Sequence, residues 1–431
     1  MVKTTNLKQG CNKFLDLIFI LSFSIGYASL IKYITYAIFP FPESIELFLF
    51  LSIVYFLRFK FHIVKNSVIL RNKLLYILLF LYLWEFVQGT KMGTDINAIL
   101  VGILILCSSF VGFQYFLNII EETNSIDRIF SSYCFYSFYS FYTILLLVFL
   151  ILLGIVYPFT NQLTTNSLFR ANMETSDVIY YFPAYLSIVS PSPSVFLSGL
   201  NLPTFSGLSH EPQAMFYAIF PAVFLFLYKF RNTKNIEIKI LIFFLIISIM
   251  TTSLTAVLCF AFTFLIHLFW LFKQGGQRKY AVGTVLLIVI GLIIFIESNM
   301  NTKFQSFMLE KTNFDADYSS GSYSLSLLTY IFSPTSFFGE GIFGSTADQA
   351  SKMSINCGYI SSCFMILFFI TFLITTMKNI FSKRLLCHSI GLACLYFILH
   401  SLKYGIALFN STYVFFIVFL LCYSDYQRKL N

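Results

Sequence analysis

The segment Gly207-Leu-Ser-His-Glu-Pro-Gln213 carries the residues best suited to chemistry in this chain. His210 and Glu211 are adjacent ionisable groups, and both can donate or accept a proton. Proline is favoured in the first turn of a helix, and a carboxylate just before that turn is stabilised by the helix dipole. The pattern predicts a catalytic pair, His210 and Glu211, at a helix start opened by Pro212. The alternative is an ordinary capping turn.

Arg170 is a second candidate, as a substrate-binding residue. Its planar guanidinium matches the oxygens of a phosphate or diphosphate, which it can hold with two parallel hydrogen bonds. The remaining arginines fall in the basic clusters between apolar runs, which makes Arg170 the exception. The alternative is a local ion pair with Glu174 or Asp177.

Further substrate-binding candidates are spread over the C-terminal half: Lys303, Lys311, Glu340, His400 and Lys403. The last two are one helical turn apart and could line one cavity, although a snorkelling lysine beside an interfacial histidine is the simpler interpretation. The run Gly339-Glu-Gly341-Ile-Phe-Gly344 matches G-x-G-x-x-G literally. It lacks the surrounding βαβ unit, so we interpret it as a tight turn rather than a nucleotide site.

The composition fixes the class of protein that must position these residues. Of the 431 residues, 58% are hydrophobic, 19% aromatic and only 11% charged, which is too few charges to cover a soluble surface. The net charge of +9 comes from short basic clusters, so nucleic acid is not an expected partner. The nine cysteines lie mostly in apolar runs without zinc-type spacing, and neither a metal nor a cofactor is expected.

The apolar runs predict an all-α polytopic membrane protein with about twelve spans, since a spanning helix needs about 20 apolar residues. The predicted spans are Phe14–Ile38, Ile45–Val64, Leu74–Val87, Ala98–Ile119, Tyr136–Tyr157, Ala214–Tyr228, Ile240–Met250, Leu254–Phe272, Ala281–Ile296, Gly358–Thr376, Leu385–His400 and Ala407–Tyr423. Together they form one integral membrane domain over residues 1–431.

The basic clusters predict the orientation of this domain. Lys3, Lys8 and Lys13 favour a cytoplasmic N-terminus, and alternation then places the other basic clusters and the C-terminus on the same side. Two long segments, 158–213 and 297–357, fall outside, and loops of this length are usually functional. Within the first, the apolar run Val178–Val189 is expected to re-enter or lie on the membrane.

This pattern resembles the bacterial O-antigen polymerase (Wzy) family, which is related to the O-antigen ligase superfamily. The resemblance rests on the predicted topology, on Gly-x-x-x-Glu-Pro at residues 207–212 and on Phe338-Gly-Glu-Gly-Ile-Phe-Gly344. Counted from Arg170, the Arg-x10-Gly pattern of the family's long loops ends at Tyr181 instead of a glycine.

The resemblance implies a glycosyltransferase of the hexosyltransferase type at the periplasmic face of the bacterial inner membrane. It would transfer the growing glycan from undecaprenyl diphosphate to a new lipid-linked repeat unit. Arg170 would hold the diphosphate, and Glu211 would act as base with His210 as its partner or substitute. The bilayer, a chain-length regulator and a flippase are the expected partners besides the lipid-linked substrates.

Two other functions fit the same topology. A lipid-linked oligosaccharide flippase would have a similar number of spans, but short loops and charges lining a central cavity are expected of it. An O-antigen ligase would share the donor and differ mainly in its acceptor. The concentration of charge in two outward loops favours an enzyme over the transporter.

Overall fold

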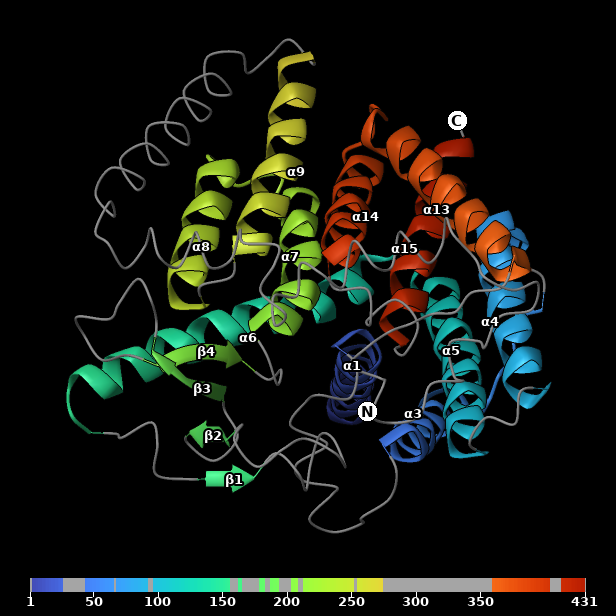
Figure 1. Ribbon diagram of the computed structural model, residues 1–431, viewed down its shortest axis with the longest axis horizontal. Coiled ribbons are helices and arrows are strands. Elements are labelled where there is room, and N and C mark those ends of the chain that lie inside the picture. Colours follow the sequence, from blue (N-terminus) through green and yellow to red (C-terminus); the bar gives the residue numbers. More distant parts are fainter. Residues whose placement is uncertain are drawn as a thin grey trace.

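The computed structural model describes residues 2–25, 43–65, 67–91, 96–155, 162–164, 178–182, 187–193, 203–207, 212–251, 254–273, 359–403 and 412–430. Helices dominate these residues (Figure 1). They are α1 (Val2–Ile25), α3 (Glu43–Phe59), the short 3-10 helix η1 (Val68–Arg71), α4 (Lys73–Lys91), α5 (Ile96–Thr123), α6 (Asp127–Leu152), α7 (Pro212–Lys229), α8 (Ile236–Thr251), α9 (Leu254–Lys273), α13 (Tyr359–Ile380), α14 (Leu385–Lys403) and α15 (Thr412–Lys429).

Four helical segments in the described part of the chain are long and apolar enough to cross a membrane: Gly102–Thr123, Asp127–Leu152, Ala256–Lys273 and Ser362–Ile380. Shorter apolar helices cover Lys73–Trp84, Met215–Lys229 and Leu385–Ser401. The prediction of an α-helical membrane protein with several spans is therefore confirmed. The number twelve is not established, because only four of the described helices have the length and hydropathy of a span and because the predicted span Ala281–Ile296 lies outside the described residues.

Several helix ends differ from the predicted spans because hydropathy marks only the apolar part of a helix. α3 stops at Phe59 instead of Val64, since Lys60 and Phe61 have positive φ angles of 51° and 57° and break the helical path. α6 begins at Asp127, well before the predicted Tyr136. Its first two turns include the polar residues Asp127, Arg128, Ser131 and Ser132, and an acidic residue at the N-terminus favours the helix there.

The helices α7 and α15 form the centre of the protein. From Met215 to Leu227 every side chain of α7 is buried, and α15 is buried from Thr412 to Asp425. α7 packs most extensively on α14 and also contacts α6, α8 and α9 (Figure 1). By contrast, Phe149 of α6 and Leu258 of α9 are largely exposed, as expected of side chains that face lipid. A helix that is apolar and buried on all sides belongs in the interior of a bundle.

Pro221 lies inside α7 and lacks a backbone N–H, so the carbonyl of Tyr217 one turn earlier loses its helical donor. In a bilayer such a carbonyl needs a partner from a neighbouring helix. The hydroxyl of Tyr413 on α15 donates to it at 2.9 Å. The next carbonyl, that of Ala218, accepts a hydrogen bond from the hydroxyl of Tyr133 on α6. The proline thus leaves a carbonyl that ties α7 to α15, and the Ala218 carbonyl adds a tie to α6.

The described parts of the first long loop form a small antiparallel sheet with the order β1 (Gln162–Thr164), β2 (Val178–Phe182), β3 (Ser187–Pro193) and β4 (Pro203–Gly207). Within the predicted segment Val178–Val189, the described residues form parts of β2 and β3, paired through Tyr180 and Val189. That this segment re-enters or lies on the membrane stays a prediction. The β-branched and aromatic residues of this run suit a strand as well as a membrane. Irregular pairing between Ser190 and Pro193 follows from the prolines, which cannot donate to the ladder.

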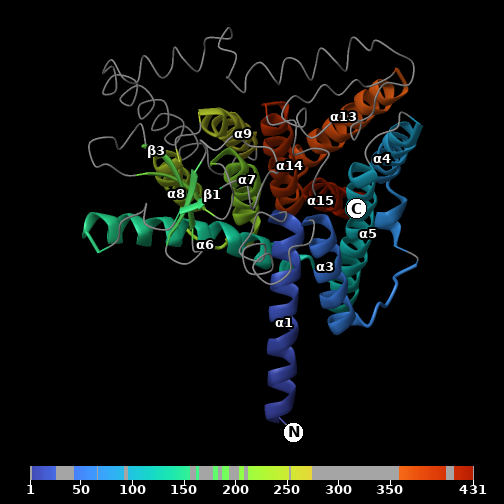
Figure 2. The same cartoon turned by 60° about the horizontal axis from the view of Figure 1, so that its bottom comes forward.

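The strand β4 packs against α6, α7 and α8. Its Phe205 side chain is fully buried. On the other side of the molecule, the N-terminal half of α1 extends away from the remaining helices (Figure 2), and its residues around Gly10 are exposed. The buried half of α1 begins near Asp16.

Candidate functional site

His210 and Glu211 lie outside the described residues, but both chain segments that flank them are described. Before them, β4 ends at Gly207; after them, α7 begins at Pro212, so the predicted helix start at this proline is confirmed. β4 is held by the buried Phe205, and α7 is the central helix of the bundle. Groups next to rigid elements are positioned more accurately than groups in free loops.

His400 is described, and it lies within the core near the C-terminal end of α14. Its ring is fully buried and lies between Tyr217, with ring centroids 5.5 Å apart, and Tyr396, at 5.6 Å. Lys403 is the last residue of α14, which agrees with the prediction that both residues stand at one helix end. Their assignment to substrate binding stays a prediction.

A group of buried polar side chains surrounds His400, and we call it the tyrosine–histidine cluster. Its members are Tyr133, Tyr217, Tyr396, His400, Ser401 and Tyr413. The hydroxyls of Tyr217 and Ser401 are 3.0 Å apart, and Ser401 donates onward to the carbonyl of Phe397 at 2.7 Å. The hydroxyls of Tyr133 and Tyr413 are 2.8 Å apart. In a buried network of this kind each hydrogen bond helps to fix one arrangement of the helices.

The cluster holds the N-terminal half of α7, which is the half next to Glu211 in the chain. Tyr217 stands five residues after Pro212 and is joined to α14 through Ser401 and to α15 through Tyr413. Because these side chains are at most 4% exposed, they position the helix instead of meeting bulk solvent. The start of α7, to which Glu211 is joined, is thereby fixed.

The remaining predicted site residues, Arg170, Lys303, Lys311 and Glu340, lie outside the described residues. The alternative partners of Arg170, Glu174 and Asp177, also lie there. These assignments stay predictions.

A buried ion cluster joins α1, α3, α5 and α6. It lies at the end of the helix bundle opposite to Pro212, the first residue of α7. The Asp16 carboxylate, fully buried, accepts hydrogen bonds from Arg58 Nε at 3.1 Å and from Arg128 Nη1 at 2.9 Å. Tyr115 donates a third at 2.8 Å, and Arg58 also pairs with Glu122. The negative charges of the two carboxylates balance the positive charges of the two guanidiniums, as burial of charge requires. In the sequence, Asp16 stands out as a single acid in an apolar run. The sequence does not indicate which residues pair with it.

Two buried histidines, His267 of α9 and His388 of α14, meet at 3.0 Å between Nδ1 and Nε2. His388 Nδ1 lies 2.6 Å from the carbonyl of Ile380, so that nitrogen carries the proton and its Nε2 accepts from His267. Trp270 stacks on His388 at 4.0 Å. The separation of the two histidines by 121 positions gives no signal of the contact.

Asp425 links the C-terminal end of α15 to the segment before α4. Its carboxylate pairs with Lys429 at 2.6 Å and with Arg428, and Asn72 Nδ2 donates to it at 3.4 Å. Burial raises the pKa of Asp425, but the hydrogen bonds and charges of Lys429 and Arg428 outweigh it, so the pKa lies below its ordinary value. Asp425 follows the predicted span, which ends at Tyr423.

The Asp16 cluster, the Asp425 cluster and a contact of Arg384 bring together the chain segments that alternation assigns to one side of the membrane. Arg58 and Arg128 meet at Asp16, Asn72 meets Asp425, and the segment around Arg384 meets the C-terminus through a hydrogen bond to the carbonyl of Gln427.

Within the described ranges no three His, Cys, Asp or Glu side chains are placed to hold a metal ion. The expectation that the protein needs no metal remains a prediction.

Comparison with known proteins finds no matching family, no matching curated protein and no matching solved structure.

Proposed function

We propose that this protein is an O-antigen polymerase of the bacterial inner membrane, with both termini in the cytoplasm. It extends a surface polysaccharide at the periplasmic face. The donor is the growing glycan on undecaprenyl diphosphate, and the acceptor is the terminal sugar of a new lipid-linked repeat unit.

This proposal is supported by the packing of the two elements that flank residues 208–211. Residues 208–211 connect β4 to α7, and both are packed into the helix bundle. The tyrosine–histidine cluster fixes α7 within its first two turns. A general base must be held within hydrogen-bond reach of its substrate, and packed elements on both sides of Glu211 in the chain favour such a position.

The reaction forms one glycosidic bond and breaks one bond to phosphate. An acceptor hydroxyl attacks the anomeric carbon of the donor sugar, and Glu211 takes the hydroxyl proton, with His210 as its partner. The bond between the anomeric carbon and the diphosphate oxygen breaks, and undecaprenyl diphosphate leaves with the electron pair. Arg170 stabilises the charge on this leaving group.

The packing of the bundle supports an enzyme over a flippase. The described interior around α7 is filled by aromatic rings, with Phe220 5.4 Å from Phe260 and 5.5 Å from Tyr396. A transporter needs a central path that a polar glycan can enter. An O-antigen ligase fits the same site, and the acceptor alone separates the two enzymes.

Deletion of the gene followed by gel analysis of lipopolysaccharide tests the function. A polymerase mutant keeps lipid core plus a single repeat unit, and the cloned gene restores the ladder. Bare core would indicate a flippase or a ligase, and polymer accumulated on the lipid carrier would then identify the ligase. A ladder of normal length in the mutant would refute all three.

Site variants test the assignment of residues in the same assay. Glu211→Gln and Arg170→Ala should abolish the ladder at an unchanged protein level. Glu174→Gln and Asp177→Asn are the matched controls, because they remove the local partners that would explain Arg170 by pairing alone. Equal losses in these controls would assign Arg170 to local structure, and a normal ladder in Glu211→Gln would exclude Glu211 as the base.

A further inference from the structure

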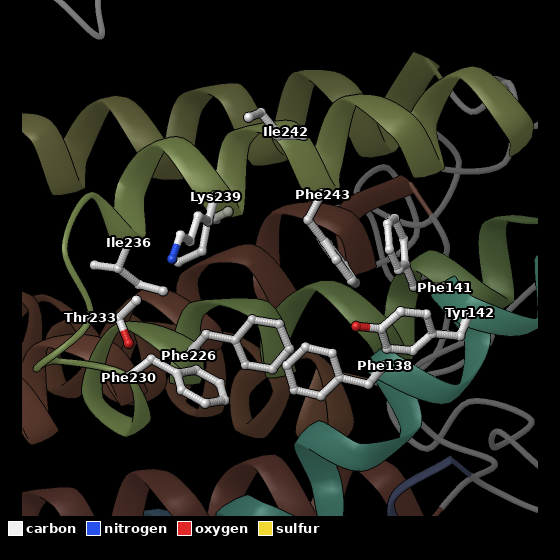
Figure 3. Close-up of a pocket in the computed structure, with 11 residues that line it drawn as sticks. Phe138, Phe141, Tyr142, Phe226, Phe230, Thr233, Ile236, Lys239, Ile242 and Phe243 are labelled. Carbon is white, nitrogen blue, oxygen red and sulfur yellow. The ribbon is translucent and has the colours of Figure 1, made fainter. Parts of the chain in front are cut away.

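A groove of about 370 Å³ lies between α6, α7 and α8 (Figure 3), within the usual range for small-molecule pockets of about 300–1,000 Å³. It is remote from the segment that holds Glu211, because its floor is the C-terminal half of α7. Its lining residues are Phe138, Phe141, Tyr142, Phe226, Phe230, Thr233, Ile236, Lys239, Ile240, Ile242 and Phe243.

One end of this groove is a wall of aromatic rings. Phe138 stacks on Phe226 with centroids 4.7 Å apart, and Phe141 stacks on Phe243 at the same distance. Tyr142, at this end in Figure 3, is 63% exposed. The groove therefore opens on the apolar flank of α6, where Phe149 is 59% exposed. Such a flank faces the hydrocarbon of a bilayer.

The other end of the groove is positively charged. Figure 3 places Lys239 beside Ile236 and Thr233, with its nitrogen directed along the groove wall. The nearest acid on its own helix, Glu237, lies 3.9 Å from His267 instead. Among the described residues, the ion pairs do not include Lys239.

The other cations of the α7–α8 connection either donate hydrogen bonds to neighbouring groups or do not line the groove. Arg231 donates to the carbonyl of Tyr228 at 3.2 Å and stacks over that ring. Lys229 donates to Ser131. Lys234 is exposed but does not line the groove. Lys239 is thus the cation that the groove offers to a bound anion.

We propose that this groove binds an anionic glycerophospholipid, with its phosphate at Lys239 and Thr233 and an acyl chain along the aromatic wall. The arrangement matches both parts of such a lipid: a cation and a hydroxyl at one end, and rings open to the bilayer at the other. Basic residues near a membrane surface attract anionic lipids of the leaflet they face. The site is independent of the polymerase reaction.

Native mass spectrometry of the detergent-purified protein tests the site. Dioleoyl phosphatidylglycerol and dioleoyl phosphatidylcholine share their acyl chains and differ in net charge. We expect phosphatidylglycerol to be retained about fivefold better, the factor that corresponds to about 1 kcal/mol for one lysine near an anionic lipid. Lys239→Gln should lower this preference to about one.

Matched variants make each part of the proposal falsifiable. Lys234→Gln removes a charge from the same connection and should leave the preference for phosphatidylglycerol unchanged. Tyr142→Ala should weaken the binding of both lipids. Phe149→Ala should weaken the binding of neither. An equal loss in Lys234→Gln would mean diffuse surface charge and would overturn the site. Full displacement of the lipid by inorganic phosphate would overturn it as well, because the occupant would then be a phosphate ion.

Discussion

The hydroxyl of Tyr413 donates a 2.9 Å hydrogen bond to the carbonyl of Tyr217, the carbonyl that Pro221 leaves without a helical donor. This bond joins the two most buried helices, α7 and α15, at the level of the tyrosine–histidine cluster. A proline that would weaken an isolated helix is thus turned into a contact between helices.

Replacement of Tyr413 by Phe should destabilise the protein by about 1 kcal/mol, because the Tyr217 carbonyl is then buried without a donor. Tyr133 keeps its own acceptor, the carbonyl of Ala218. Pro221→Ala restores an N–H to the helix and should remove most of this cost in the double variant. Thermal unfolding of the four proteins in detergent measures the coupling. Additive effects of the two substitutions would show that the hydroxyl does not serve the carbonyl.

Asp16→Asn should have a much larger effect, a loss of about 3–5 kcal/mol, because it leaves two guanidiniums beside a buried neutral amide. Arg58 and Arg128 are only 6% and 22% exposed at their side chains. Protein level in membranes and unfolding in detergent are the measurements. Glu122→Gln is the control: the Glu122 side chain is 43% exposed, and its loss should cost less than about 1 kcal/mol. Equal effects would mean that Asp16 does not organise the cluster.

The apolar runs predicted the positions of the described helices well, because burial in lipid demands continuous apolar sequence. Pro212 likewise marked the start of α7 correctly. The sheet of the first loop was missed, because the apolar run from Val178 suits a strand and a membrane surface equally. Composition by itself cannot separate these two environments.

Contacts between distant segments could not be predicted from one sequence. His400 was identified as a candidate, but its burial between Tyr217 and Tyr396 depends on how α7 and α14 pack. The same holds for His267 and His388. Periodicity indicates which face of a helix is apolar and leaves open which helix covers it.

Gly391 lies where α14 crosses the end of α13, and an added Cβ there would stand 2.7 Å from the backbone nitrogen of Ile380. Because a backbone atom cannot move aside as a side chain can, Gly391→Ala should destabilise the protein by about 1–3 kcal/mol. Gly10 of α1 is the control, since nothing lies within 4 Å of its added Cβ. Gly10→Ala should be neutral or stabilising by up to about 1 kcal/mol. Unfolding in detergent distinguishes the two, and an unchanged stability of Gly391→Ala would contradict the close approach of α13 and α14.

Asp425 should make the stability of the protein depend on acid pH. Its pKa in the folded protein lies below the ordinary value because Lys429 and Arg428 stabilise the carboxylate against the cost of burial. A lowered folded-state pKa means that the stabilisation is fully present above the unfolded pKa, about 3.9 for an aspartate, and is lost as the pH falls through the folded value.

Thermal unfolding in detergent from pH 7 to pH 3 should therefore show a decline below about pH 4 that is smaller in Asp425→Asn. The substitution lowers stability at pH 7, where the ion pairs are intact, and the two proteins should approach each other in acid. Glu237→Gln serves as the control, since that side chain lies beside His267 and is not part of the Asp425 cluster. Parallel pH curves for the parent protein and Asp425→Asn would show that the pairs with Lys429 and Arg428 contribute nothing to folding. Convergence would instead assign part of the acid sensitivity to the carboxylate that joins α15 to Asn72.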